Sequence, residues 1–166
     1  MRIINLCYWE IDTVIGKKDK SDSVLLTITE RMTRKEIIRK IHGKTAESVQ
    51  FTISKLIEEA REHFSKVFKS ITSDNGSEFA DLASIESSTE TKVYFAHPYR
   101  SGERGTNERH NGLIRRFIPK RRLIREFSIE SISRVQNWCN TLPRRILNYQ
   151  TPDEAFEDQL IKVLYN

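Results

Sequence analysis

The fold is decided by the stretch WEIDTVIGKKDKSDSVLLTIT, residues 9–29. Residues 9–15 and 23–29 are rich in apolar and β-branched side chains, and the polar segment 16–22 between them is typical of a turn. After a second polar turn, residues 35–41 can form a third strand. Three strands joined by short polar turns predict an antiparallel meander.

The hydrophobic period lengthens after this meander. Apolar residues recur at helical spacing over residues 45–64, and Thr45 is a suitable N-cap for that helix. A fourth strand is predicted at residues 68–73, where an Asp-Asn-Gly turn at 74–76 ends it and a short helix is expected to follow. A fifth strand is predicted at residues 92–96.

Helices are predicted for most of the remaining chain. Residues 107–117 and 128–142 each place apolar side chains on one helical face, and Pro152 is expected to close the segment that follows. The predicted order is therefore β-β-β-α-β-α-β-α, followed by further helices. That order indicates a ribonuclease-H-like α/β fold, in which a mixed five-stranded sheet is flanked by helices.

Size and composition fit one domain spanning residues 1–166. Hydrophobic residues make up 37% of the chain and charged residues 31%, which is typical of a soluble globular protein. No apolar run reaches the length of a membrane span and no signal-peptide pattern is present, so no membrane partner is expected. Cys7 and Cys139 lack zinc-site spacing, which favours two reduced thiols in a cytosolic protein.

The chain is basic, with a formal net charge of +5, and this charge is unevenly distributed. Residues 100–125 carry nine Lys or Arg against two acids, whereas residues 46–90 carry nine acids against four bases. A concentrated basic stretch is typical of a nucleic-acid surface, and a solvated helix face is an equal alternative. The charge pattern therefore indicates a DNA partner without establishing one.

Three acids stand at positions that suggest a shared function. Asp12 interrupts the first strand, Asp74 ends the fourth, and Glu108 lies in the first turn of a helix. In a ribonuclease-H-like sheet the first and fourth strands are neighbours, so the aspartates would approach each other and the helix start could face them. Carboxylates that close repel unless a cation lies among them. Hard oxygen ligands suit Mg²⁺ or Mn²⁺, and two such ions support in-line phosphoryl transfer.

Each acid also has a structural interpretation. Asp74 suits a turn and Glu108 suits the positive end of a helix dipole, and for either acid alone this structural role is the stronger interpretation. Asp12 is evenly balanced, because an unpaired acid in an apolar strand is costly. Taken together, in this element order, the three acids favour a metal site.

Five blocks of sequence carry a family resemblance. They are WEIDTVIG at 9–16, SDNGSEF at 73–79, YFAHPY at 94–99, ERGTNERHNGLIRRFIPK at 103–120 and LNYQTPDEAF at 147–156. The first two blocks resemble the first-aspartate and second-aspartate motifs of the IS-thirty family of insertion-sequence transposases. The third and fourth blocks together resemble its glutamate block, and the fifth resembles its common tail. The glutamate block is long and specific, and the five blocks extend over nearly the whole chain.

The resemblance implies a DDE-type transposase core with a retroviral-integrase-like fold. Such an enzyme nicks DNA at transposon ends and joins the freed 3′-hydroxyl to a target, with two Mg²⁺ or Mn²⁺ ions and no covalent enzyme–DNA intermediate. It implies that Asp12, Asp74 and Glu108 are the catalytic metal ligands. It also implies a bacterial cytoplasmic protein at the nucleoid, and a homodimer or higher assembly during synapsis. Only eight residues precede Trp9, so we expect the family's N-terminal helix-turn-helix region to be absent.

Supporting residues are predicted beside the three acids. Asn75 and His110 are expected to assist the ligands through waters or hydrogen bonds, although Asn75 also suits a plain turn and a lone histidine is seldom a ligand. Phosphate contacts position DNA without reading its sequence. They are predicted for Arg104, Arg109, Asn111, Arg115, Arg116, Lys120, Arg121 and Arg122.

Two other functions stay open on the sequence alone. One is a ribonuclease-H-like nuclease that cuts without strand transfer. The other is a DNA-binding or dimerisation module that is inactive on its own. Metal-dependent nicking that disappears on Asp12→Asn would separate an enzyme from such a module.

Overall fold

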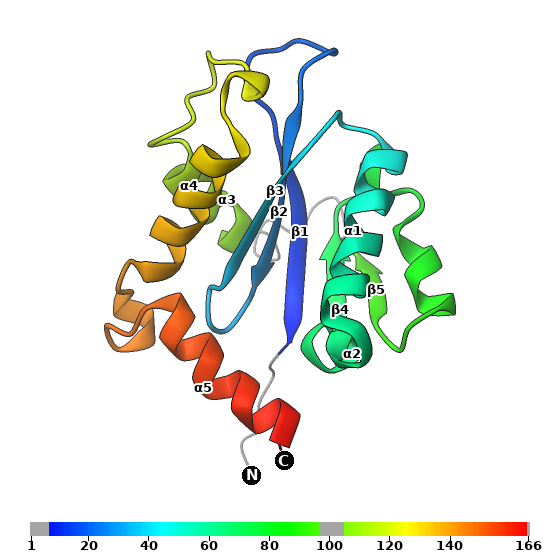
Figure 1. Cartoon of the computed structure of the whole chain (residues 1–166), viewed down its shortest axis with the longest axis vertical. Coiled ribbons are helices and arrows are strands. Elements are labelled where there is room, and N and C mark those ends of the chain that lie inside the picture. The colour runs from blue at the N-terminus through cyan, green and yellow to red at the C-terminus, as the bar shows by residue number, and fades with distance from the viewer. Residues whose placement is uncertain (1–6, 97–104, 166) are drawn as a thin grey trace.

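The computed structural model describes residues 7–96 and 105–165, with side chains of the second segment described from residue 109 onward. One sheet forms its centre (Figure 1). Its strands are β1 (Tyr8–Val14), β2 (Val24–Glu30), β3 (Glu36–Ile41), β4 (Ser70–Ser73) and β5 (Lys92–Phe95). They lie in the order β3-β2-β1-β4-β5, with antiparallel pairing among the first three strands and parallel pairing of β4 with β1 and β5. The predicted mixed five-stranded sheet is confirmed.

Helices cover both faces of this sheet (Figure 1). On one face, α1 (Ala46–Ala60) runs through the 3-10 turn η1 (Arg61–His63) into the short α2 (Phe64–Val67). On the other face lie α3 (Gly105–Ile114) and α4 (Ile129–Thr141), and α5 (Pro152–Tyr165) packs against both α2 and α4. Further 3-10 turns are η2 (Ser77–Phe79), η3 (Leu82–Ser87), η5 (Ile124–Glu126) and η6 (Arg145–Leu147).

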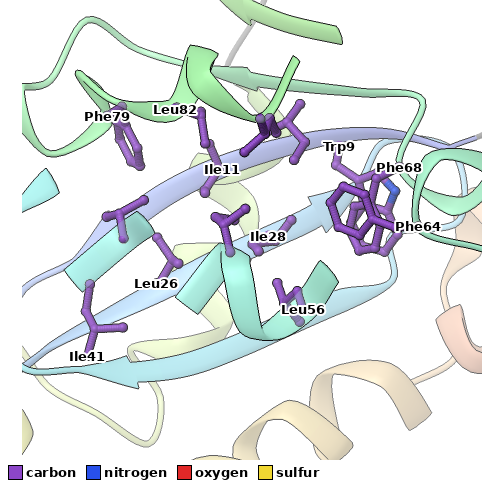
Figure 2. Close-up of a cluster of buried hydrophobic side chains, with 14 of the residues drawn as sticks. Trp9, Ile11, Leu26, Ile28, Ile41, Leu56, Phe64, Phe68, Phe79 and Leu82 are labelled. Atoms are coloured by element: carbon purple, nitrogen blue, oxygen red, sulfur yellow. The ribbon is translucent and has the colours of Figure 1, made fainter. Parts of the chain in front are cut away.

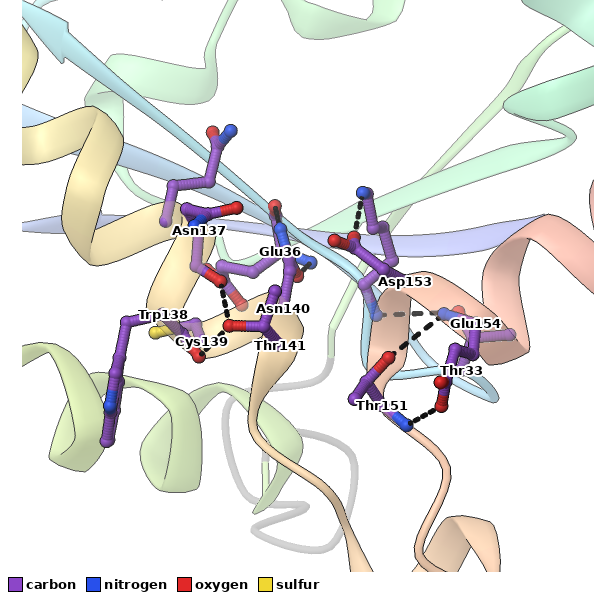
Figure 3. Close-up of polar contacts among 12 residues, drawn as sticks. Thr33, Glu36, Asn137, Trp138, Cys139, Asn140, Thr141, Thr151, Asp153 and Glu154 are labelled. Carbon is purple, nitrogen blue, oxygen red and sulfur yellow. Dashed lines mark hydrogen bonds and ion pairs between the residues drawn. The ribbon is translucent and has the colours of Figure 1, made fainter.

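Side-chain caps mark the starts of α1 and α5, and two local predictions differ from the structure. Thr45 caps α1 as predicted, accepting a hydrogen bond from the Ser48 backbone N–H at 3.2 Å. The expected short helix after residues 74–76 is instead the pair of 3-10 turns η2 and η3. Pro152 begins α5 rather than closing a segment. Proline is tolerated there because its missing N–H needs no partner, and Thr151 and Glu154 form a reciprocal capping box around it (Figure 3).

The larger hydrophobic core fills the space between the sheet and the α1 face (Figure 2). Alternation along β1 sends Trp9 and Ile11 to this face, where Ile53 of α1 and Ile71 of β4 are completely buried. The Trp9 ring stacks on Phe68 at 4.6 Å between centroids. This packing fixes β1 and β4 side by side, which matters because both strands carry candidate site residues at their ends.

A second core lies under α3 and α4 and contains Val14, Leu25, Ile114, Ile132 and Cys139 among its buried side chains. A side-chain amide joins α4 to the edge strand β3. The Asn140 side chain exchanges two hydrogen bonds of 2.8 Å with the backbone of Glu36 (Figure 3).

Both cysteines are buried, unpaired thiols. Burial raises the pKa of Cys139 to about 12 and that of Cys7 to about 11, with the nearby Glu36 and Glu30 carboxylates adding to the respective shifts. Both thiols are therefore neutral packing groups at physiological pH. Within the described residues, no helix combines the length and apolar character needed to span a membrane.

Candidate active site

Asp12 lies near the carboxyl end of β1, half-buried, with its carboxylate reached from α3. One of its oxygens accepts a hydrogen bond from the Thr13 backbone N–H at 2.9 Å, and the other lies 3.5 Å from the side-chain amide of Asn111. Asn111 belongs to α3, so this contact joins the helix to the strand. The acid that interrupts an apolar strand is therefore held in a defined orientation beside the helix that carries Glu108.

Asp74 directly follows the last residue of β4 and is half-buried. Its Oδ1 accepts a hydrogen bond from the Gly76 backbone N–H at 2.8 Å, which closes a local turn. A Cβ added to Gly76 would meet this oxygen at 2.8 Å and would clash with the Glu78 carboxylate. A larger residue at position 76 would therefore require the Asp74 and Glu78 carboxylates to move.

Asp12 and Asp74 occupy equivalent positions relative to the β1–β4 pairing. β1 and β4 run parallel, and each aspartate lies two residues beyond the last paired residues, Glu10 and Thr72. Neighbouring strands lie about 4.8 Å apart. Ligands of α/β sheets bind beyond the carboxyl ends of parallel strands, and both acids stand at such an end. The predicted approach of the first and fourth strands is thus found in the fold.

Glu78 is a buried acid that is not among the residues predicted for the site. Its side chain is 3% exposed, accepts a hydrogen bond from the Thr13 hydroxyl at 3.0 Å, and forms an ion pair with Lys44 at 3.3 Å. Thr13 is next to Asp12, and Glu78 itself abuts the Asp74 turn. The Glu78 carboxylate therefore contacts both the residue next to Asp12 and the turn that contains Asp74. The available signal was Phe79, a large apolar neighbour that pulls this turn into the core.

The side chains of Arg104 and Glu108 lie outside the described residues; the backbone of Glu108 belongs to α3. Among residues whose side chains are described, no three His, Cys, Asp or Glu residues are grouped so that they could hold a metal ion. The predicted three-acid cluster includes Glu108, so its convergence stays a prediction. The donor chemistry fits the expected ions, since Asp12 and Asp74 offer hard carboxylate oxygens.

His110 faces a different partner from the two aspartates. It is buried, and its Nδ1 lies 2.8 Å from Oε2 of Glu36, a completely buried carboxylate that also accepts a hydrogen bond from the Thr29 hydroxyl. Glu36 opens β3, whereas Asp74 follows β4, and both β2 and β1 lie between those strands. Asn75 is exposed in the turn after β4. The roles predicted for His110 and Asn75 in supporting the ligands stay predictions.

The basic residues predicted to contact DNA divide by how firmly the protein holds them. Arg115 donates to the Ile15 carbonyl oxygen at 2.6 Å, and burial lowers the pKa of its guanidinium. Arg122 forms an ion pair with Glu126 at 2.6 Å. Arg116 lies over the Trp138 ring at 5.8 Å. These three side chains have partners within the protein. Lys120 and Arg121 are exposed.

Lys120 and Arg121 share a groove of about 640 Å³ with Lys17 and Lys18 of the β1–β2 turn. Backbone contacts fix the two segments together: the Lys17 N–H donates to the Arg122 carbonyl at 2.8 Å. The Asp22 carboxylate also accepts hydrogen bonds from two backbone N–H groups of the Leu123–Arg125 region, at 2.7 and 3.0 Å. The groove begins at the end of β1, just beyond Asp12. Lys17 and Lys18 were absent from the predicted contacts because they come from a distant part of the sequence.

Comparisons with known proteins agree with this architecture. Residues 6–101 match the family model described as "Integrase core domain". The catalytic core domain of BIV integrase, a solved structure, superposes with a TM-score of 0.65 over 94% of this chain and 97% of that one, at 17% identity. That likeness confirms the ribonuclease-H-like, retroviral-integrase-like fold.

Insertion-sequence transposases are among the curated relatives. The chain is 42% identical over 148 residues to the transposase for insertion sequence element IS4351 of Bacteroides fragilis, covering 89% of this chain and 44% of that protein. It is 35% identical over 153 residues to the transposase InsI for insertion sequence element IS30C of Escherichia coli (strain K12), covering 92% and 38% respectively. The chain thus spans less than half the length of these relatives, and the resemblance to the IS-thirty family is confirmed.

Proposed function

Because the chain belongs to the integrase core domain family, we propose that it cleaves DNA and transfers the freed 3′-hydroxyl end to a second DNA strand, as the catalytic core of a DDE transposase. The observation that carries the proposal is the parallel pairing of β1 with β4, since Asp12 and Asp74 each lie two residues beyond the paired Glu10 and Thr72. The transposase relatives support the choice of reaction.

We infer that Asp12, Asp74 and Glu108 would hold two Mg²⁺ or Mn²⁺ ions. Carboxylates brought together from three elements repel one another unless cations compensate them. When bound, two such ions would activate the attacking oxygen and stabilise the leaving oxygen of an in-line displacement. The hydrogen bond between Asn111 and Asp12 supports the inclusion of Glu108, since Asn111 lies three residues along the same helix.

The protein's own contribution is to hold these carboxylates in place. Asn111 and the Thr13 N–H orient Asp12, and the Gly76 N–H orients Asp74. Glu78 fastens Thr13 to the Asp74 turn, and its ion pair with Lys44 offsets the extra negative charge. Fixed ligands favour catalysis because no reorganisation is needed when the substrate arrives.

The groove of Lys17, Lys18, Lys120 and Arg121 supports a DNA substrate, because clustered cations beside a phosphoryl-transfer site attract the phosphate backbone. Exposed lysines contact phosphate without reading bases. The proposal extends to two further points: the protein acts at the bacterial nucleoid in the cytoplasm, and two or more copies assemble when transposon ends are brought together.

The experiment that tests the reaction supplies the chain with Mn²⁺, a supercoiled plasmid and a short duplex that has a free 3′-hydroxyl. We expect nicked plasmid and a covalently joined oligonucleotide–plasmid product, both abolished by EDTA. Nicks without a joined product would identify a nuclease instead. The absence of both products would leave only a DNA-binding module.

A melting experiment tests the metal ligands separately. Ligand binding to the native state at a concentration of about 100 Kd stabilises it by about 2.7 kcal/mol, so Mn²⁺ should raise the Tm of the wild type by roughly 5–10 °C. Glu108→Gln should lose most of that rise. Glu130→Gln, an exposed acid in the first turn of α4, is the matched control and should behave as wild type. An equal rise in all three proteins would remove Glu108 from the metal site.

A further inference from the structure

A pocket of about 260 Å³ opens beside α3, on the side away from the lysine groove, and it is lined by cations from three separate segments. Arg34 comes from the β2–β3 turn, Arg109 and His110 from α3, and Arg144 and Arg145 from the segment at η6. Among the described residues, no carboxylate lines it. Buried carboxylates lie nearby: Glu10 and Glu30 act electrostatically on Arg34. Glu36 acts on Arg144, lies 2.8 Å from His110 and accepts a hydrogen bond from Thr29.

Two arginines of this pocket are partly buried. Burial lowers the pKa of the Arg34 guanidinium, and the neighbouring Arg109 charge lowers it further, whereas the Glu10 and Glu30 carboxylates raise it. Burial is also the main cause of the lowered pKa of Arg144, which the Glu36 carboxylate raises. Arginine remains charged under these conditions. Arg34 and Arg109 are therefore neighbouring like charges, and a bound anion would interact favourably with both.

Arg144 presents hydrogen-bonding capacity that the protein does not use. Its Nη2 donates to the Cys139 carbonyl at 2.8 Å, which fixes the plane of the guanidinium. Its Nε is buried and has no hydrogen-bond partner among the described residues. Buried donors are nearly always satisfied in native proteins. A guanidinium that is held in place and has an unused N–H donor is well suited to hydrogen-bond a phosphate group.

We propose that this four-arginine pocket binds a phosphate group, and, resting on the proposed function, that the phosphate belongs to the backbone of the DNA substrate. A volume of about 260 Å³ is at the small end for ligand sites, which favours a single phosphate over a whole nucleotide. α3 connects the pocket to the candidate active site, because His110 lines the pocket and the adjacent Asn111 contacts Asp12. DNA lying along α3 would thus be held on both sides of the reacting phosphate, by this pocket and by the lysine groove.

The test measures binding of a short DNA duplex by fluorescence anisotropy across a salt series, in EDTA so that no cleavage occurs. Arg145→Gln and Arg109→Gln are exposed changes in the pocket wall, and Arg134→Gln on α4 removes the same charge outside it. Each pocket variant should bind roughly tenfold more weakly and lose about 0.9 from the slope of log K against log salt, as the loss of one phosphate contact requires. Arg134→Gln should match the wild type.

A second arm identifies the source of the phosphate. The Tm of the wild type and of the Arg109→Gln/Arg145→Gln double variant is measured in inorganic phosphate and in chloride at equal ionic strength. Stabilisation by phosphate in the wild type alone, with DNA binding equal in all variants, would assign the pocket to free phosphate. Equal DNA binding together with no phosphate effect would overturn the pocket proposal. If the wild type itself fails to bind DNA, the proposed function fails, and the phosphate arm still decides the pocket.

Discussion

Asp12→Asn is expected to reduce Mn²⁺-dependent nicking and strand transfer by at least about a thousandfold. A metal-bound transition state is stabilised by several kcal/mol, and each 1.36 kcal/mol corresponds to a tenfold change in rate. Asparagine keeps the shape of the side chain and can still accept the hydrogen bond that Thr13 donates at 2.9 Å. The folded state should therefore survive while a charged metal ligand is lost.

Asp81→Asn is the matched control for this experiment. Asp81 follows Asp74 by seven residues and is exposed, so its substitution removes one negative charge near the same edge of the sheet without touching the candidate ligands. Its nicking rate should remain within a factor of two or so of the wild type, as for most surface changes. Full activity in Asp12→Asn, with melting behaviour unchanged, would show that the reaction does not depend on this carboxylate.

Trp9→Ala is expected to lower the free energy of unfolding by about 3–5 kcal/mol, the usual cost of removing a large buried aromatic side chain. The Trp9 side chain is 1% exposed, and its Nε1 donates to the Val67 carbonyl at 2.8 Å. Its ring stacks on Phe68 and meets the Phe156 ring of α5 edge-on at 5.7 Å between centroids. The substitution would leave a cavity at the junction of β1, α2 and α5.

Urea unfolding of three variants separates the sources of that loss. Trp9→Phe keeps an aromatic ring but leaves the Val67 carbonyl without its donor, and should cost about 1–3 kcal/mol. Phe51→Ala, at an exposed position on α1, should stay within about 0.5 kcal/mol of the wild type. A Trp9→Ala variant as stable as Phe51→Ala would contradict the assignment of Trp9 to the core.

The order of elements and the positions of the aspartates follow from the sequence by itself. Alternating apolar residues, polar turns and the change to helical spacing are local signals, so they predict the meander, α1 and its Thr45 cap without knowledge of distant contacts. Asp12 could be recognised as an acid inside a strand, and Asp74 as an acid at a strand end, for the same reason. The local signal was weakest where helical turns were short, at η2 and η3, since a single turn leaves no period to detect.

The tertiary structure alone decided which residues share a site. The parallel pairing of β1 with β4 joins segments about sixty residues apart, and no local pattern specifies such a pairing. Burial of Glu78, the engagement of Arg115 by the Ile15 carbonyl, and the meeting of Arg34 with Arg144 beside α3 are likewise products of packing. Charge is visible in the sequence, but whether a charge faces solvent, a carbonyl oxygen or another charge depends on the folded chain around it.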